Sequence, residues 1–347
     1  MGLRRKSPSF WKRCRHRIEA AFLALLAASI PLLSRRLLVG LANGLGRLAF
    51  HLLAYERRVA LTNLDIAFGP DKSAAEKKRI VVTSFQNFAR SFLGLFWAQR
   101  QGGAALEKLV EVDAESLRRV QELRHRGKAI IFVTLHYGEW EWLGLATARS
   151  GIPMTIVAEQ TRNPHVERIL NRLRSRTGNR TILQRFAVTK LFKELKRGGC
   201  VALLIDLNAP QGRGGIWLDF FGRPVFNNSA AAALALHTGA PIVGGVAYPL
   251  PDGRVRIVYG PEIPVEPTGD RAADLLAISQ RCLDYCEAII RDRPDFWLWF
   301  YRRWKFRPSP EKGNFPDYSI YFERLRLPRA QKDRANQRAR VGRHGDP

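Results

Sequence analysis

The chain has 347 residues, of which 46% are hydrophobic, 57 are Lys or Arg and 31 are Asp or Glu. This hydrophobic fraction supports a substantial core and excludes a chain that is disordered along most of its length. The formal net charge of +26 indicates an anionic partner, which is usually nucleic acid, anionic lipid or an acidic protein. The four cysteines form no C-x-x-C pair, and the sequence contains no P-loop and no dinucleotide-binding glycine motif.

The first 55 residues combine basic clusters with apolar segments. Residues 12–17 are mostly basic and stand just before the apolar residues 20–33, as juxtamembrane clusters do. That apolar segment is shorter than the roughly 20 residues of a spanning helix, and Pro31 interrupts it. Residues 37–55 are amphipathic. We therefore expect residues 1–55 to be a basic N-terminus and a membrane-associated helical segment. A signal peptide also fits this order of segments, but no cleavage site is convincing.

Helical and strand patterns alternate further along the chain. Helices are predicted at residues 74–99, 113–126, 139–148, 163–177, 187–197, 228–238 and 271–291, and strands at residues 129–134, 154–158, 200–205, 241–248 and 254–259. This alternation predicts an α/β fold in which helices flank a mainly parallel central sheet. No linker divides residues 56–310, so we expect one domain there. Residues 311–347 are basic with few apolar residues, which predicts a disordered tail.

The strand predicted at residues 129–134 is followed by His136-Tyr137-Gly138-Glu139-Trp140-Glu141. The histidine therefore lies where a strand gives way to a helix, which is where α/β proteins usually place ligands. If His136 lies in the turn, the carboxylate of Glu141 can fold back onto the imidazole, as suits a general base acting on an alcohol. Helix N–H groups nearby would favour a developing oxyanion. The same spacing also fits a polar loop histidine beside a solvated acid.

The His-x-Gly-x-Trp-Glu block resembles the signature of the bacterial late acyltransferases of lipid A biosynthesis, a branch of the lysophospholipid acyltransferase superfamily. The resemblance extends from about residue 18 to residue 308. Two positions depart from the family pattern: Glu139 stands where asparagine is common, and Tyr301 stands where a histidine often precedes the Arg-Arg pair. Further blocks follow in the family's order at residues 57–64, 171–178, 203–206, 215–222, 237–241 and 297–305.

The resemblance implies a glycerolipid acyltransferase-like fold and an O-acyltransferase. Such an enzyme would move a fatty acyl chain from acyl carrier protein to a hydroxyl of a lipid A precursor, without a metal or another cofactor. His136 would be the general base and Glu141 would orient it. Arg174 and Asp206 would be substrate-binding positions, with Arg174 at a phosphate and Asp206 ordering the pocket wall. Residues 168–180 are rich in arginine, so a solvated Arg174 is the alternative.

The aromatic residues of these blocks have two interpretations each. Residues 299–305, with Arg302, Arg303 and Lys305 among aromatic residues, suit either a surface that faces lipid headgroups or an interfacial or packed element. Other aromatic residues are candidates for the acyl groove, although such residues also commonly form core: Trp140, Trp142, Phe220 and Phe221.

Other functions are compatible with parts of the sequence. An acyltransferase could instead modify another glycolipid or a phospholipid and use acyl-CoA. The alternatives of another class are a nucleic-acid-binding protein, supported by charge alone, and a noncatalytic membrane-surface protein. No nucleic-acid recognition module is present, so we expect no nucleic acid as partner. We expect acyl carrier protein or acyl-CoA as donor, a glycolipid acceptor and anionic membrane lipids.

The expected donor also bears on location. A full span with the charged N-terminus inside would export the catalytic domain away from a cytosolic acyl donor. We therefore expect a monotopic or re-entrant anchor on the cytoplasmic face of the bacterial inner membrane.

Overall fold

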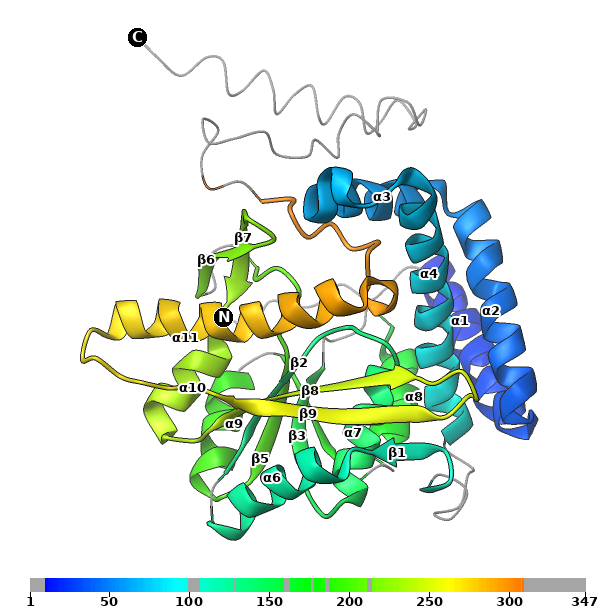
Figure 1. The fold of residues 1–347 in the computed structure, drawn as a ribbon. Helices are drawn as coiled ribbons and strands as arrows, with labels where there is room; N and C mark the ends of the chain where they lie inside the picture. The colour runs from blue at the N-terminus through cyan, green and yellow to red at the C-terminus, as the bar shows by residue number, and fades with distance from the viewer. Residues whose placement is uncertain are drawn as a thin grey trace.

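A seven-stranded sheet forms the centre of the molecule (Figure 1). The computed structural model describes residues 10–98, 107–127, 129–158, 163–175, 178–184, 187–210, 214–306 and 308. The strands of the sheet are β1 (Val110–Val112), β2 (Ile131–Thr134), β3 (Met154–Ala158), β4 (Arg180–Leu183), β5 (Cys200–Leu204), β8 (Ile242–Pro249) and β9 (Val255–Ile263). Their order is β1-β9-β8-β2-β5-β3-β4; β8 and β9 run antiparallel, and the other neighbouring pairs run parallel. The predicted mainly parallel sheet is confirmed.

Helices cover both faces of this sheet, and β2 shows how. Successive side chains of a strand point to opposite faces. Ile131 and Val133 accordingly belong to one core cluster and Phe132 to the other. The first cluster includes residues of α9 (Ala187–Lys196), α10 (Ala230–Thr238) and α11 (Arg271–Asp292). The second includes residues of α4 (Ala74–Trp97), α6 (Ala114–His125) and α7 (Trp140–Arg149), and residues of α8 (Pro164–Ser175) pack against it. Figure 1 shows α11 and α6 on opposite sides of β8 and β9.

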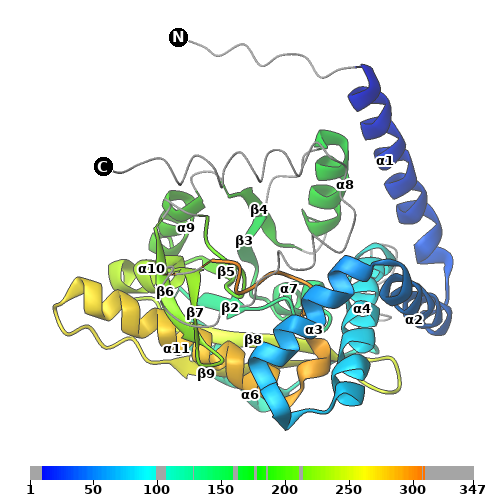
Figure 2. The same cartoon turned by 90° about the horizontal axis from the view of Figure 1, so that it is seen from above.

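Three further helices precede the sheet: α1 (Phe10–Ser29), α2 (Arg35–Leu52) and α3 (Ala54–Phe68). Helix α2 packs along α4, and α1 runs beside α8 (Figures 1 and 2). The buried residues of α2 are spaced four apart, at Leu38, Ala42, Gly46 and Phe50. Gly46 permits this close packing, because a Cβ atom there would overlap the backbone of Gln86. The opposite face of α2 exposes leucines at positions 37, 41, 45, 48 and 52.

The described helices contain no single segment with both the length and the apolar content to cross a bilayer. Helices α2 and α3, taken together through Asp71, reach that length and composition but are bent by 91°. A short 3-10 helix, η1 (Ile30–Leu32), separates α1 from α2 and contains Pro31.

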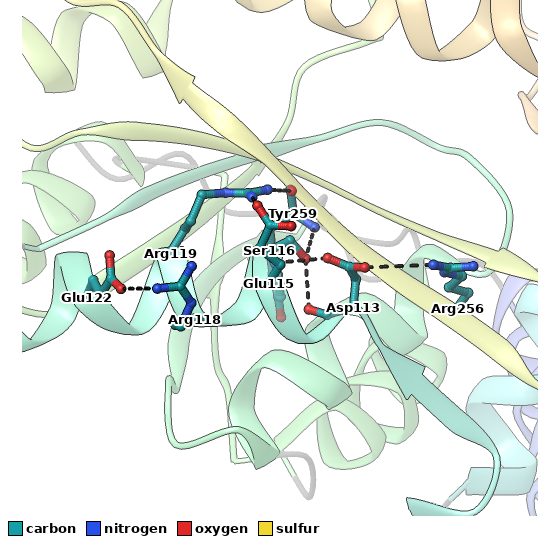
Figure 3. Close-up of polar contacts among 8 residues, drawn as sticks. All are labelled: Asp113, Glu115, Ser116, Arg118, Arg119, Glu122, Arg256 and Tyr259. Atoms are coloured by element: carbon teal, nitrogen blue, oxygen red, sulfur yellow. Dashed lines mark hydrogen bonds and ion pairs between the residues drawn. The ribbon is translucent and has the colours of Figure 1, made fainter.

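Helix α6 is fixed to β9 by a local polar network (Figure 3). The side chain of Asp113 caps the helix by accepting from the Ser116 amide at 2.9 Å, and the Ser116 hydroxyl accepts from the Tyr259 amide at 3.2 Å. The Tyr259 side chain crosses to α7, where its hydroxyl lies 2.8 Å from that of Thr147. Burial raises the pKa of Tyr259 to about 12, against a smaller opposing effect of the bond to Thr147. The network therefore holds α6 and α7 on the same strand.

The segment that follows η4 (Pro294–Phe296) is largely packed. Its interpretation as a headgroup-facing surface is wrong for Trp299, Arg303 and Trp304, whereas Arg302 and Lys305 are exposed. Trp297, Trp299 and Trp304 are at most 1% exposed. Arg303 is also buried, with its guanidinium bonded to Asn208 and Asn227. The hairpin of β6 (Gly215–Phe220) and β7 (Arg223–Asn228) supplies Phe220, whose ring stacks on Trp304.

Asn63 of α3 fastens this segment to the N-terminal helices. Its fully buried side-chain amide donates to the carbonyl oxygens of Trp299 and Tyr301, both at 2.6 Å. We expect Asn63→Ala to lower the free energy of unfolding by about 2–4 kcal/mol, because two carbonyl groups lose a donor inside the protein. Denaturant unfolding of the purified variant measures the change. A loss of less than about 0.5 kcal/mol, the usual range for surface substitutions, would contradict this role for Asn63.

Candidate active site

The ends of β2 and β5 bring His136 and Asp206 together. The two strands are parallel neighbours, and Thr134 lies opposite Leu204 in the register. Two residues beyond this pair, the chains reach His136 and Asp206 side by side. The His136 ring Nδ1 lies 2.9 Å from Asp206 Oδ1, and the His136 amide donates to Asp206 Oδ2 at 2.9 Å. The indole of Trp297 donates to the same Oδ2 at 2.9 Å.

Asp206 is completely buried, so its charge state depends on these partners. Burial raises the pKa of the carboxyl group, but the charge of His136 and the hydrogen bonds from His136 and Trp297 outweigh burial, and the pKa lies below its ordinary value. An ionised carboxylate can only accept hydrogen bonds. Nδ1 of His136 therefore carries a proton, and in the neutral ring Nε2 is the basic nitrogen.

The loop that carries His136 is held on both sides. The His136 carbonyl accepts from the Leu298 amide at 3.1 Å, and the Gly138 amide donates to the Phe296 carbonyl at 2.9 Å. Gly138 has φ of +55°, and a Cβ atom there would overlap the carbonyl oxygen of Ala247 in β8. The glycine of the sequence motif is therefore required by both its conformation and its close approach to β8.

His136 opens onto an apolar cavity of about 420 Å³. The cavity lies between the sheet and the helices α4, α7 and α8, and Glu141 and Trp140 line it together with His136. The Trp140 ring meets the imidazole edge-on, with 5.3 Å between centroids. The remaining lining side chains are mainly aliphatic or aromatic, such as Phe88, Phe92, Leu143, Ile156, Leu170 and Leu204.

Glu139, the other acid of the motif, forms an ion pair with helix α2. Its carboxylate is completely buried and accepts from Arg35 Nη2 at 2.8 and 3.0 Å. Arg35 is the first residue of α2, and its guanidinium lies over the Trp142 ring at 5.2 Å. Burial lowers the pKa of the neighbouring Arg90, although the Glu139 charge acts in the opposite sense. Glu139 is therefore an ion-pair partner of α2.

The other residues singled out from the sequence lie in several places. Trp142 is 1% exposed and stacks on Trp97. Phe220 and Phe221 belong to the core cluster on the α9–α11 face and are absent from the described lining of the cavity. Arg174 lies in α8, but its side chain falls outside the described residues, as do the basic residues 4–6 and the tail 311–347.

The site combines a histidine held by a buried acid with an apolar cavity. This arrangement can take a proton from a hydroxyl group while a hydrocarbon chain occupies the cavity. The sequence predicted the histidine and both acids that lie near it, but not that Asp206 bonds to His136 or that Trp297 shares that carboxylate. The signal available was the position of Asp206 just after a buried strand, where an acid needs a partner.

We expect Asp206→Asn to lower the free energy of unfolding at neutral pH by about 3 kcal/mol, because three N–H groups lose a charged acceptor. The folded-state pKa of Asp206 lies below its ordinary value of about 3.9. Its contribution to stability is therefore complete above the unfolded-state pKa and is lost as pH falls through the folded-state pKa. The difference between wild type and variant should shrink in denaturant titrations carried out below about pH 4.

A matched control is Asp284→Asn, which changes an exposed acid on α11. Its effect should be small at every pH. A stability gap for Asp206→Asn that does not change with pH would contradict the buried ionised carboxylate.

Comparisons with known proteins show which family the chain resembles. A family model described as bacterial lipid A biosynthesis acyltransferase matches residues 7–306. The chain is 25% identical over 278 residues to the lipid A biosynthesis lauroyltransferase of Escherichia coli (strain K12), which covers 78% of this chain and 85% of that protein. It is 24% identical over 276 residues to the lipid A biosynthesis palmitoleoyltransferase of the same strain, covering 79% and 86%. The lipid A biosynthesis acyltransferase 2 of Shigella flexneri is 23% identical over 285 residues, covering 78% and 85%. The chain therefore belongs to the bacterial lipid A biosynthesis acyltransferase family.

Proposed function

We propose that this acyltransferase of lipid A biosynthesis moves a fatty acyl chain from the thioester of acyl carrier protein to a hydroxyl of a lipid A precursor. The observation that carries the proposal is the position of His136, which bonds to buried Asp206 and opens onto the apolar cavity. A general base beside a hydrocarbon-sized space is what transfer of an acyl chain to an alcohol requires.

In the proposed reaction, Nε2 of His136 removes the proton from the acceptor hydroxyl. The alkoxide oxygen attacks the thioester carbonyl carbon, and a tetrahedral intermediate forms. Collapse of that intermediate breaks the carbon–sulfur bond, and the thiol leaves with the proton that His136 held. Asp206 keeps Nδ1 protonated and stabilises the imidazolium, which is the role of the acid in a Ser-His-Asp triad. Glu141, which lines the same cavity, orients the ring or the incoming hydroxyl.

One feature supports stabilisation of the oxyanion, and two support binding of the chain. Helix α7 begins at Trp140, and its N-cap residue Glu139 makes no side-chain cap bond, so the positive end of the helix lies beside the histidine loop. The cavity volume of about 420 Å³ falls within the range of small-molecule sites. Trp140 lines the cavity, as a groove residue would.

We propose that the exposed apolar faces of α1 and α2 rest on the cytoplasmic face of the inner membrane. On α1, Ile18, Phe22 and Leu25 are each more than 60% exposed, and α2 exposes the five leucines named above. Phe88 and Phe92 both line the cavity and reach the surface, being 40% and 36% exposed. A lipid acceptor could therefore reach His136 directly from the bilayer, while a carrier protein approaches from the cytoplasm.

The catalytic proposal is tested with purified protein, acyl carrier protein loaded with a fatty acid, and lipid A precursor. We expect His136→Ala to lower the rate of transfer by about 10²–10⁴-fold, because the variant lacks the base. His237→Ala, which changes an exposed histidine at the end of α10, should keep wild-type activity. Unchanged transfer by His136→Ala would exclude the histidine as base.

The acceptor and donor are identified separately. Mass spectrometry of lipids from cells that lack the gene should show lipid A without one acyl chain. Loss of a chain from another glycolipid or phospholipid would instead identify a different acceptor. Transfer from acyl-CoA but not from the carrier protein would replace the proposed donor.

Membrane binding is tested by flotation with vesicles that contain an anionic phospholipid. We expect Leu37→Asp with Leu41→Asp to weaken binding at least about tenfold, because two apolar side chains become charged on the proposed contact surface. Leu276→Asp, which changes an exposed leucine of α11, is the matched control. Equal binding by both variants would place the membrane contact elsewhere.

A further inference from the structure

One residue in the cavity wall is a glycine that the backbone does not need. Gly144 lies in the middle of α7, and its φ does not lie in the left-handed region. Glycine inside a helix costs about 1 kcal/mol relative to alanine. A Cβ atom on Gly144 would lie 3.5 Å from both Asn179 Nδ2 and Ile156 Cδ1, which is ordinary van der Waals distance. Neither conformation nor close packing therefore explains this glycine.

Gly94 of α4, by contrast, has a steric reason, because a Cβ atom there would overlap the Trp142 indole. Gly245 of β8 also lines the cavity, and a Cβ atom there would lie 3.4 Å from atoms of Leu143 and Tyr259. Gly144 differs from Gly245 in its place, since it lies inside a helix, where glycine is disfavoured.

Gly144 lies partway along the cavity. Residues three apart share a helix face, so Glu141, Gly144 and Thr147 follow one another along the lining side of α7. Glu141 is beside the His136 end, and Thr147 is about 9 Å further along the helix axis. The lining residues of β3, which faces α7, follow the same order. Ala158 is nearest the His136 end, Ile156 lies two residues further into the cavity, and Met154 lies two residues beyond Ile156.

Asn179 encloses the space at this depth. Its buried side chain donates to the Gly144 carbonyl at 2.8 Å and accepts from the Met154 amide at 2.9 Å. Asn179 therefore ties α7 to β3 and fixes the width of the gap that Gly144 faces.

We propose that Gly144 sets the length of the acyl chain that the enzyme transfers. This inference rests on the proposed function. A chain whose carbonyl carbon lies at His136 passes beside Gly144, Ile156 and Asn179 before it reaches Thr147 and Met154. A side chain at position 144 narrows this passage, so that a shorter acyl chain still fits and a longer one does not.

The test compares wild type with Gly144→Ala and Gly144→Val in a mixture of carrier-bound saturated chains that differ by two carbons. We expect the alanine variant to change the ratio of short to long chains transferred by at least about tenfold, since one methyl group in an apolar pocket discriminates to this extent. The valine variant should shift the ratio further. Mass spectrometry of the acylated product measures the distribution.

Stability separates this effect from damage to the fold. Gly144→Ala should unfold at the same or a higher temperature than wild type, because alanine favours the helix. Gly40→Ala introduces the same change in α2, where a Cβ atom meets nothing within 4 Å, and should leave the chain distribution unchanged.

An unaltered distribution in both Gly144 variants, or an equal loss of all chain lengths by folded protein, would overturn the inference. Failure of the wild type to transfer any carrier-bound chain would instead overturn the proposed function.

Discussion

The site depends on one buried carboxylate that receives hydrogen bonds from three N–H groups. Asp206 holds the ring and the backbone of His136, and it holds the indole of Trp297 from a distant part of the chain. A buried charge without such partners would cost several kcal/mol. The end of β2, the end of β5 and the segment after η4 therefore have to meet for the acid to be tolerated. Formation of the proposed base is thus part of closing the fold.

Helix α7 connects the histidine loop to the sheet on one side and to helix α4 on another. Its first turn follows the histidine loop, its lining side faces the cavity, and Thr147 binds to Tyr259 of β9. Trp142 lies on a different side of the helix and packs on Trp97 of α4, below Arg35. The position of α7 relative to the sheet therefore determines both where the loop with His136 lies and how wide the cavity is.

The sequence predicted much of this fold, because the long strands and helices have clear patterns. The sequence also predicted where β2 and β5 end, and therefore that His136 and Asp206 each follow the end of a strand. Strand order cannot be read from such patterns, so the adjacency of β2 and β5 was not predicted. Glu141 was predicted to contact His136 because the two residues are close in the sequence. The contact between Asp206 and the imidazole follows from the register of the parallel strands β2 and β5.

Other misses have similar causes. Strand β1 has three residues, and β4 is a four-residue edge strand that begins with an exposed arginine. Such short elements lack a periodic signal. The aromatic and basic residues 297–305 have the same composition whether they pack or face lipid, and burial of Arg303 depends on Asn208 and Asn227 from elsewhere. The partner of Glu139 lies 104 residues away, so only the tertiary structure reveals it.

That ion pair has a practical consequence for anyone who wishes to simplify the protein. Removing the first two helices to obtain a smaller fragment would take away the Arg35 guanidinium that pairs with Glu139, three residues from His136. The buried acid would keep the nearby charge of Arg90 but lose both hydrogen bonds from Arg35, which favours protonation of Glu139 or movement of its loop toward water. The amino-terminal helices are thus a structural part of the enzyme's interior rather than a detachable tether.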